Sequence, residues 1–396
     1  MKIVQINASC GLGSTGKICV GISKLLTESS IENYILYSYG NSDYPLGIKC
    51  ASLLYIKIQA LKSRVLGNYG FNSLLETLLI IKHLKRINPD IVHLHNIHGH
   101  DCNLDILLKF IKRNRIKVVW TFHDCWAFTA YCPYFLFEKC SKWQSECSDC
   151  PVFRTKSWLF DRSKYLFKRK KDAMSGLDLT IITPSHWLAD TVKASFLKNY
   201  PVHVIGNGID LDTFKPTPSR FREKHNIPQS KYMVLGVAFD WDNRKGLDVF
   251  VELASRLDHE QYQIVLVGTN QHIDARLPKN IITIHRTQNQ NELAAIYTAA
   301  DVFVNPTRED NYPTVNMESL ACGTPIITTN DSGGSAEIID FLTGDAVRAD
   351  DIRALEVKIV QACTSNVYTV DNCLLKAQSF NQQEKYKEYL SLYKNI

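Results

Sequence analysis

The sequence predicts an α/β fold made of two parallel-sheet domains, and three observations support this prediction. The chain has 396 residues, of which 45% are hydrophobic, and this length exceeds the range in which a single core usually keeps growing. Short β-branched runs alternate with longer amphipathic segments in both halves, a pattern typical of parallel βαβ units. Between the halves, residues 205–218 gather Gly, Asn, Asp and Pro without a helical or strand period, which indicates a domain junction.

Each half supplies its own set of expected strands. The first half predicts strands at residues 3–6, 34–37, 91–94, 118–121, 179–182 and 202–205. The second predicts strands at residues 233–237, 264–267, 281–284, 302–304 and 326–328, with helices beginning near Gly246, Glu292 and Asn316. We therefore expect two Rossmann-like domains with a cleft between them, residues 1–206 and 207–380. A final helix within residues 381–396 could cross back to the first domain.

Composition limits the classes of partner. The formal net charge is +6 and the isoelectric point is about 8.6, which suits phosphate-bearing ligands or an anionic membrane surface but falls short of a nucleic-acid-binding footprint. The N-terminus shows no signal-peptide pattern. Apolar runs such as residues 74–81 stay far below the ~20 residues that a membrane-spanning helix needs. We expect a cytoplasmic protein that contacts a membrane at most peripherally.

A glycine loop follows the first predicted strand. Gly11, Gly13 and Gly16 fit the G-x-G-x-x-G dinucleotide fingerprint, so a nicotinamide-dependent oxidoreductase is an alternative. However, the second strand ends in Tyr-Ser-Tyr-Gly and lacks the acid that would bind the ribose. The loop also resembles a Walker A loop, except that Ile18 replaces the Ser or Thr that would reach Mg²⁺. Glycines before a helix N-terminus favour an anion or acceptor contact, and we assign that contact to Gly13, Ser14, Thr15 and Gly16.

Acidic and basic residues follow two strands of the second half. Residues 305–313 leave one strand and contain Glu309 and Asp310, and a helix carrying Glu318 follows. Residues 242–246, which contain Arg244 and Lys245, follow another strand. Because ligands bind at the carboxyl edge of a parallel sheet, the acids are placed to accept hydrogen bonds from sugar hydroxyls, and the two cations can neutralise a diphosphate.

These segments resemble the retaining GT-B glycosyltransferases of the large fourth family. The resemblance is carried by the Arg-Lys-Gly turn, the acidic loop, the Glu-Ser-Leu-Ala-Cys-Gly-Thr-Pro helix, and in the first half by Thr-Phe-His-Asp at residues 121–124, Thr-Pro-Ser at 183–185 and Asn-Gly-Ile-Asp at 207–210. It implies that Arg244 and Lys245 bind the donor phosphates and that Glu318 binds the ribose. It also implies that His123 lines the reaction site and that Asn311 contributes to donor binding. The transferred sugar would contact Asp310, which has the usual spacing of eight residues from Glu318, or Glu309, the more typical residue type.

The resemblance also implies a reaction. A sugar would move from a nucleotide diphosphate to a glycan or lipid-linked acceptor in polysaccharide biosynthesis, with retention at the anomeric carbon by front-face attack. Negative charge builds up on the leaving phosphate, and prepositioned cations and helix N-termini can stabilise it without a catalytic metal or cofactor. Two alternatives remain at this stage, the oxidoreductase and a sugar-nucleotide-binding protein without catalysis.

Four of the twelve cysteines lie close together, within an insertion at about residues 125–152. Cys132, Cys140, Cys147 and Cys150 have a spacing that suggests a structural tetrahedral Zn²⁺ site, although disulfides or packed thiols are alternatives. The next segment, residues 157–173, mixes aromatic and basic residues. It predicts either a basic helix that lies on an anionic membrane or a solvated face over a core stripe.

Overall fold

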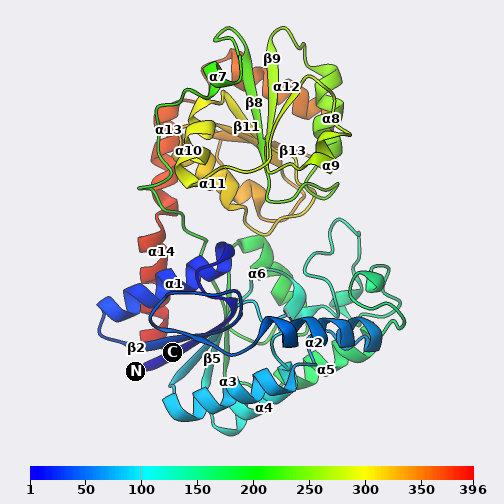
Figure 1. The fold of residues 1–396 in the computed structure, drawn as a ribbon, viewed down its shortest axis with the longest axis vertical. Coiled ribbons are helices and arrows are strands. Elements are labelled where there is room, and N and C mark those ends of the chain that lie inside the picture. The colour runs from blue at the N-terminus through cyan, green and yellow to red at the C-terminus, as the bar shows by residue number, and fades with distance from the viewer. Residues whose placement is uncertain (99) are drawn as a thin grey trace. The chain divides into compact units, whose positions relative to one another are not determined.

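The computed structural model describes residues 1–98 and 100–396, and the chain divides into two compact units (Figure 1). Unit 1 comprises Met1–Ile205 and Tyr386–Ile396, and unit 2 comprises Gly206–Lys385. Each unit has its own parallel sheet. The predicted α/β class with two parallel-sheet domains is therefore confirmed.

Unit 1 is built on a seven-stranded sheet in the order β3-β2-β1-β4-β5-β6-β7. All adjacent strands pair in parallel, for example Ile3 with Ile91 across β1 and β4. The strands are β1 (Lys2–Ser9), β2 (Glu32–Tyr39), β3 (Gly47–Lys49), β4 (Ile91–Leu94), β5 (Lys117–Thr121), β6 (Leu179–Thr183) and β7 (Val202–Val204). Central strands such as β4 and β6 are buried along their whole length, as expected for a sheet that is covered on both faces.

Helices cover both faces of this sheet. They are α1 (Gly13–Glu28), α2 (Leu53–Leu66), α3 (Leu74–Ile87), α4 (Leu104–Arg113), α5 (Ser163–Met174) and α6 (His186–Lys193). One hydrophobic core combines α3, α4 and α5 with one sheet face. On the other face, Ile18 and Ile22 of α1 pack with Tyr386, Tyr389 and Tyr393 of α14 (Gln382–Asn395). Residues from both ends of the chain therefore build one core.

Unit 2 is built on a six-stranded sheet in the order β10-β9-β8-β11-β12-β13. Its strands are β8 (Tyr232–Val237), β9 (Tyr262–Val267), β10 (Ile281–Ile284), β11 (Val302–Asn305), β12 (Ile326–Thr329) and β13 (Gly344–Val347). Its helices are α7 (Phe221–Lys224), α8 (Leu247–Arg256), α9 (Gln271–Asp274), α10 (Gln290–Ala299), α11 (Thr314–Ala321), α12 (Ile352–Thr364) and α13 (Val370–Ala377). The strand order reverses between β8 and β11, and this reversal is the topological switch point at which ligands bind in such sheets.

The structure differs from the sequence prediction in three segments. Strands β3 and β13 lie at sheet edges and were missed, since Gly47–Lys49 is short and Gly344–Val347 includes Asp345. The basic helix expected over residues 157–173 begins only at Ser163. Within that helix, Lys170 is fully buried rather than solvated. Among the described residues, no helix has the length and apolar character required to cross a membrane.

Candidate functional site

Two loops meet at the carboxyl edge of the unit 2 sheet. Residues 238–246 follow β8, and residues 306–313 follow β11, the neighbouring strand. Gly246 ends the first loop with a φ of 78°, and a Cβ atom at this position would lie 2.5 Å from the Pro306 carbonyl oxygen. The close approach of the two backbones therefore requires glycine at this position. This close approach places residues 242–246, which carry Arg244 and Lys245, directly beside the acidic loop at residues 306–313.

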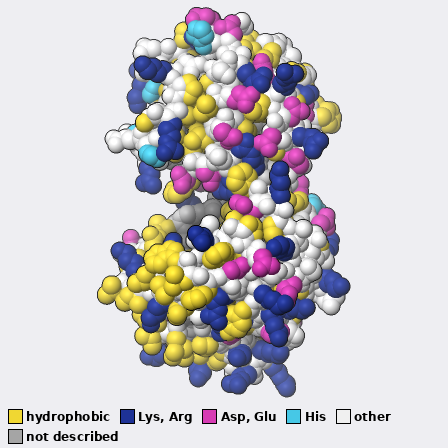
Figure 2. All heavy atoms as spheres, turned by 90° about the vertical axis from the view of Figure 1, so that its right-hand side faces the viewer, with side chains coloured by type: hydrophobic (Ala, Val, Ile, Leu, Met, Phe, Trp, Pro, Cys, Tyr) yellow, Lys and Arg dark blue, Asp and Glu magenta, His cyan; other side chains and the backbone are white. Residues whose placement is uncertain are grey.

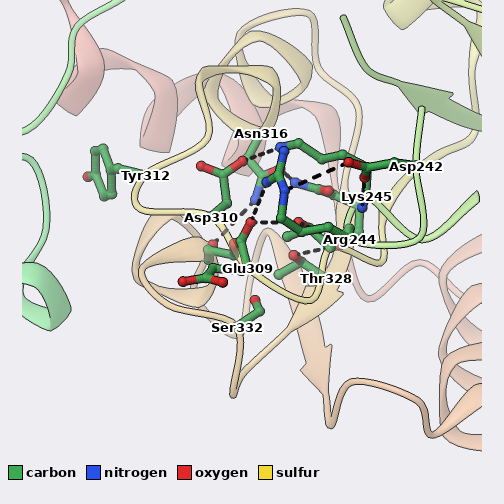
Figure 3. Close-up of polar contacts among 12 residues, drawn as sticks. Asp242, Arg244, Lys245, Glu309, Asp310, Tyr312, Asn316, Thr328 and Ser332 are labelled. Carbon is green, nitrogen blue, oxygen red and sulfur yellow. Dashed lines mark hydrogen bonds and ion pairs between the residues drawn. The ribbon is translucent and has the colours of Figure 1, made fainter. Parts of the chain in front are cut away.

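The predicted cations and acids contact one another (Figure 3). Lys245 Nζ forms an ion pair with Asp310 Oδ2, and Arg244 Nη1 donates to the Glu309 carbonyl oxygen over 2.9 Å. The side chains of Lys245 and Asp310 are 22% and 18% exposed, so both remain accessible from solvent. The Glu309 side chain, in contrast, is fully buried. The structure thus brings Arg244, Lys245 and Asp310 together at one edge and encloses Glu309.

The loops are anchored by a residue that sequence reasoning missed. Arg308 donates twice to Asp248, over 2.7 Å in each case, and once to Asp350 over 2.6 Å. Its backbone N–H donates to the Arg244 carbonyl oxygen over 2.8 Å. Burial would raise the pKa of Asp248, but the hydrogen bonds and charge of Arg308 outweigh it and lower that pKa. The signal in the sequence was an arginine inside the acidic loop. It was missed because the acidic partners of Arg308 lie 60 and 42 residues away in the sequence.

Helix α11 carries the remaining predicted donor residue. Tyr297 Oη donates to Glu318 Oε2 over 3.3 Å. Burial, together with the nearby carboxylate of Glu318, raises the pKa of Tyr297, so Tyr297 remains a protonated donor. Asn316, also on α11, receives a hydrogen bond from Asn305 of β11 over 2.8 Å. Asn311 is buried in the loop that joins the two elements. The helix is therefore held to the strand, and Glu318 has a defined orientation.

In unit 1, histidines gather where β4 and β5 end. His95 Nδ1 lies 3.2 Å from His123 Nε2, and the two rings are nearly parallel. Beside them, His98 Nε2 lies 2.8 Å from Asp124 Oδ2, and His98 Nδ1 lies 3.2 Å from Tyr69 Oη. Sequence reasoning identified His123 but missed His95 and His98. The signal that could have found them was the His-x-His-x-x-His spacing that begins at His93 inside the buried strand β4 and continues past its end.

Burial controls the charge of this cluster. It lowers the pKa of His123 to about 4, an effect that the neighbouring Asp124 partly opposes and that His98 reinforces. Burial also lowers the pKa of His95 and of His93 well below the ordinary value. Burial alone would raise the pKa of Asp124, but contact with His98 brings it below its usual range. At neutral pH the imidazoles of His93, His95 and His123 are therefore uncharged.

The glycine loop is a tight turn at the start of α1. Gly16 is buried, and a Cβ atom there would lie 2.8 Å from Ser9 Oγ. Asn7 Nδ2 lies 3.4 Å from Thr15 Oγ1, and Asn7 Oδ1 accepts from the Asn96 backbone N–H over 3.1 Å. Gly13 and Ser14 are exposed at the helix N-terminus. The loop thus lies at the same carboxyl edge of the unit 1 sheet as the segment that follows β4.

The four predicted zinc ligands share one small cavity. Cys132, Cys140, Cys147 and Cys150 all line a space of about 20 Å³, which has room for one water-sized sphere. The thiol of Cys132 hydrogen-bonds to the sulfur of Cys150, which raises the pKa of Cys132. In the part of the chain that the structure describes, no group of three or more His, Cys, Asp or Glu side chains has the arrangement of a metal site. The cysteines are gathered, and the zinc site remains a prediction.

A buried lysine holds this insertion in place. Lys170 Nζ of α5 donates to the carbonyl oxygens of Trp126, Thr129 and Ala130 over 2.6, 2.8 and 3.2 Å. It also lies 3.5 Å from the centroid of the Trp126 ring. Burial lowers the pKa of Lys170 well below its ordinary value. Lys170 therefore has a structural role, and the basic character of this helix at the surface comes from its other lysines.

Comparisons with known proteins match both halves of the chain. Residues 57–213 match the family described as Glycosyltransferase Family 4, and residues 219–374 match the family described as Glycosyl transferases group 1. Together with the two parallel-sheet units, these matches define a glycosyltransferase of the GT-B class. The chain belongs to the family of glycosyltransferases that these two descriptions cover. The matches identify a glycosyltransferase and not the nicotinamide-dependent oxidoreductase that the glycine loop suggested.

Relatives and solved structures match the chain at low identity. A protein of Escherichia coli strain K12, described as a candidate colanic acid biosynthesis glycosyl transferase, WcaC, is 22% identical with full coverage of both chains. An O-antigen biosynthesis glycosyltransferase of Escherichia coli, WclY, is 24% identical over 63% of each chain. The sucrose-phosphate synthase of Thermosynechococcus elongatus has a TM-score of 0.71 at 17% identity, covering 100% of this chain and 98% of its own. The Anabaena protein Alr3699/HepE, solved with UDP, has a TM-score of 0.70 at 13% identity with full coverage of both chains. These structures show the fold.

Proposed function

We propose that this enzyme transfers a sugar, with retention and without a catalytic metal, from a nucleotide diphosphate donor to a glycan or lipid-linked acceptor in polysaccharide biosynthesis. The observation that carries the proposal is the meeting of two cations with an accessible carboxylate at the switch point of unit 2. Support for the donor class comes from Anabaena Alr3699/HepE, which has been solved with UDP and with UDP-glucose. Support for the pathway comes from the names of the relatives in colanic acid and O-antigen biosynthesis.

Arg244 and Lys245 are assigned to the donor diphosphate. When the bond from sugar to diphosphate breaks, negative charge builds up on the leaving phosphate, and two fixed cations stabilise that charge. Lys245 pairs with Asp310, so the carboxylate holds the ammonium group in place until phosphate competes for it. Glu318 is assigned to the ribose. Asn311 is assigned a supporting role in donor binding, and the Gly13–Gly16 turn is assigned to an anion or acceptor contact.

Asp310 is assigned to the transferred sugar in preference to Glu309. Its carboxylate is partly exposed at the sheet edge, whereas the Glu309 side chain is fully buried and only its carbonyl oxygen takes part in the contact with Arg244. Adjacent residues that leave a strand point in different directions, so one of them serves the ligand. His123 of unit 1 is assigned to the reaction site.

Release of nucleotide diphosphate tests the function. The purified enzyme is incubated with a panel of nucleotide sugars and lipid-linked or oligosaccharide acceptors, and nucleotide diphosphate release and the anomeric configuration of the product are measured. A donor at 100 times its Kd should also stabilise the fold by about 2.7 kcal/mol. Failure of every nucleotide diphosphate and nucleotide sugar to raise the melting temperature would overturn the donor class. An inverted product would overturn retention alone.

We also propose that unit 1 binds peripherally to an anionic membrane, such as the cytoplasmic face of the inner membrane. The surface responsible, which we call the apolar face, consists of exposed large hydrophobic side chains on α2, α3 and residues 158–160. Its members are Leu53, Leu54, Ile58, Leu61, Leu66, Leu74, Leu75, Leu78, Leu79, Trp158, Leu159 and Phe160. Figure 2 shows hydrophobic side chains gathered on unit 1 with Lys and Arg among them. Patches of this extent on a protein surface mark interaction sites.

The segments of the apolar face are neighbours. Tyr55 Oη of α2 accepts from the Leu75 backbone N–H of α3 over 3.2 Å, and the Trp158 N–H donates to the Arg64 carbonyl oxygen over 2.7 Å. The sole acidic residue in the α2 and α3 sequences is Glu76, and it is buried. Exposed cations on the same helices are Lys57, Lys62, Arg64, Lys82, Lys85 and Arg86. On α2 and α3, leucines flanked by cations and without exposed carboxylates on those two helices match a lipid surface of negative charge.

Vesicle binding tests this surface. Wild-type protein should sediment with vesicles that contain phosphatidylglycerol, and less with purely zwitterionic vesicles. Leu54→Glu/Leu78→Glu should lose this binding, whereas Val357→Glu/Leu375→Glu, which changes exposed hydrophobic residues of unit 2, should retain it. Equal sedimentation of both double variants would overturn the proposal. Loss of a dimer instead of loss of vesicle binding would assign the face to a second copy of the chain.

The structural zinc site is proposed on the shared cavity of the four cysteines. Four thiolates are a preferred donor set for Zn²⁺, and a closed site of this kind stabilises a loop-rich segment without entering the reaction. Protein purified without added metal should contain about one zinc per chain, and Cys147→Ser/Cys150→Ser should lose it. Metal-free protein with an unchanged melting temperature would rule the site out.

A further inference from the structure

A chain of three hydrogen bonds runs through unit 1 and ends at His123. It starts at the Cys19 carbonyl oxygen in α1, passes through the side chain of Gln5 in β1, and reaches His95 directly after β4. From His95 it continues to His123, directly after β5. Gln5, Cys19 and His95 are almost fully buried. The arrangement therefore links one backbone group to the ring that the proposed function places at the reaction site.

The direction of the first bond is fixed by chemistry. A backbone carbonyl oxygen is only an acceptor, so Cys19 must receive its hydrogen bond from the amide nitrogen of Gln5, and this distance is 2.9 Å. The opposite orientation of the amide would place two acceptor oxygens against each other. Gln5 Oε1 therefore faces His95 as an acceptor, with 3.1 Å between Gln5 Oε1 and His95 Nε2. It follows that His95 carries a proton on Nε2.

The position of the proton on His95 then determines the tautomer of His123. A neutral imidazole has one N–H donor and one acceptor nitrogen, so a proton on Nε2 of His95 leaves Nδ1 as an acceptor. His95 Nδ1 lies 3.2 Å from His123 Nε2, and this contact is a hydrogen bond only if His123 Nε2 is the donor. His123 Nδ1 is then the acceptor nitrogen of that ring. The Trp120 indole N–H also donates to the His95 carbonyl oxygen over 3.0 Å and holds the backbone at this point.

The surroundings of His95 favour an uncharged ring. His93 stacks on His95 with 3.9 Å between ring centroids, and the nearest carboxylate of the cluster, Asp124, pairs with His98. A proton on His95 would thus be buried among other imidazoles. His93 makes separate contacts, with Thr121 Oγ1 over 2.8 Å and with Tyr393 Oη over 2.6 Å. It is a neighbour of the chain of bonds and not a member of it.

We propose that Gln5 and His95 are positioning residues that hold His123 in the neutral Nε2–H tautomer. This inference rests on the proposed function for the place of His123 at the reaction site. It deepens that function by naming the two residues that fix the protonation pattern of the His123 ring.

Nitrogen NMR on histidine-labelled, full-length protein tests the tautomer directly. Long-range ¹H–¹⁵N correlations distinguish protonated from unprotonated ring nitrogens, and the His123 signals are assigned by their loss in His123→Gln. We expect the Nε2–H pattern for both His95 and His123 from pH 6 to pH 8. A His123 ring that is protonated on Nδ1, or charged at pH 7, would overturn the proposal. This readout does not depend on transfer activity, so it can succeed or fail separately from the proposed function.

Gln5→Met tests the origin of the tautomer, because it keeps the side-chain volume and removes both hydrogen bonds. In this variant the His123 signals should split into two tautomer populations, and kcat should fall roughly five- to tenfold with KM little changed. His93→Asn is the matched control, because it changes a buried histidine of the same cluster outside the chain of bonds. It should leave the His123 tautomer intact. If folded Gln5→Met retains a pure Nε2–H ring at His123, the carbonyl of Cys19 does not set the tautomer and the proposal fails.

Discussion

The two units present their functional residues in opposite ways. In unit 2, charged side chains stand partly exposed at the sheet edge, and the loops beneath them are held by backbone contacts and by Arg308. In unit 1, the imidazoles of His93 and His95 are buried and uncharged, and the hydrogen bonds that reach His123 run through the core itself. The first arrangement separates function from folding, because the ligand-binding groups are not the anchoring groups. The second joins them, because the residues that orient His123 also fill the interior.

The largest expected effect tests whether the exposed charges of unit 2 bind the ligand without stabilising the fold. Arg244→Ala/Lys245→Ala should lower kcat/KM by about 100-fold or more, since each charged hydrogen bond to the leaving diphosphate contributes ~1.5–3 kcal/mol. The melting temperature should stay near that of the wild type, because both residues lie on a loop that other contacts hold. Steady-state kinetics and thermal unfolding provide the two measurements.

The matched control is Arg220→Ala/Lys224→Ala, which removes two exposed cations of unit 2 that lie outside the two loops. It should change neither quantity. If the two double variants show equal activity, the diphosphate binds elsewhere, and the glycine turn at the start of α1 becomes the leading alternative.

A second pair of variants compares the partly exposed carboxylate of Asp310 with the buried carboxylate of Glu309, its neighbour in the same loop. Asp310→Asn should lower kcat roughly 10- to 100-fold while the protein still binds nucleotide diphosphate, because a neutral amide is a weaker acceptor for sugar hydroxyls. Glu309→Gln should instead lower the melting temperature, since it alters a fully buried side chain. Calorimetric binding of nucleotide diphosphate, kinetics and thermal unfolding are measured for both. Equal and mild losses of transfer would mean that neither acid contacts the sugar.

The smallest expected effect concerns the pH dependence of the stability of unit 1. His123 has a pKa of about 4 when folded, against an ordinary value near 6.5 in the unfolded chain. Between these values the unfolded state binds more protons, so stability falls as pH falls from 6.5 towards 4. At pH 5 this linkage amounts to at most about 2 kcal/mol for one such ring, less where solvent reaches it. His100, with a pKa of about 4, adds to the same trend.

Hydrogen exchange at pH 7.5 and pH 5 can follow the two units separately. Protection should decrease in unit 1 before unit 2, and His123→Gln should weaken the pH dependence. In unit 2, the pKa of Asp248 is lowered, so the stability that its carboxylate contributes is lost only at lower pH, as the carboxylate becomes protonated. Earlier loss of protection in unit 2 would contradict the assignment.

The sequence predicted the parts of this molecule that depend on local pattern. Buried strands such as Ile91–Leu94 and Val302–Asn305 appear where β-branched runs stand, and the helix after Gly246 begins where the glycine turn predicts it. The edge strands β3 and β13 escaped prediction because β3 has three residues, none of them buried, and β13 includes the polar Asp345, so both carry a weak hydrophobic signal. Arg308, Gln5 and His95 escaped because their partners are distant in the sequence, and only the folded sheet brings them together. Lys170 was read as a surface charge because its carbonyl partners belong to a loop without periodicity.

The division of the chain into Met1–Ile205 with Tyr386–Ile396 on one side and Gly206–Lys385 on the other has a consequence for synthesis. Unit 2 is inserted in the sequence of unit 1, so a ribosome makes all of unit 2 before it makes the tyrosines of α14. Until then, Ile3, Ile22 and Ile91 lack their packing partners, and His93 lacks Tyr393. The first unit to be translated is therefore the last to be completed, and a nascent chain must keep one open hydrophobic surface while its neighbour folds.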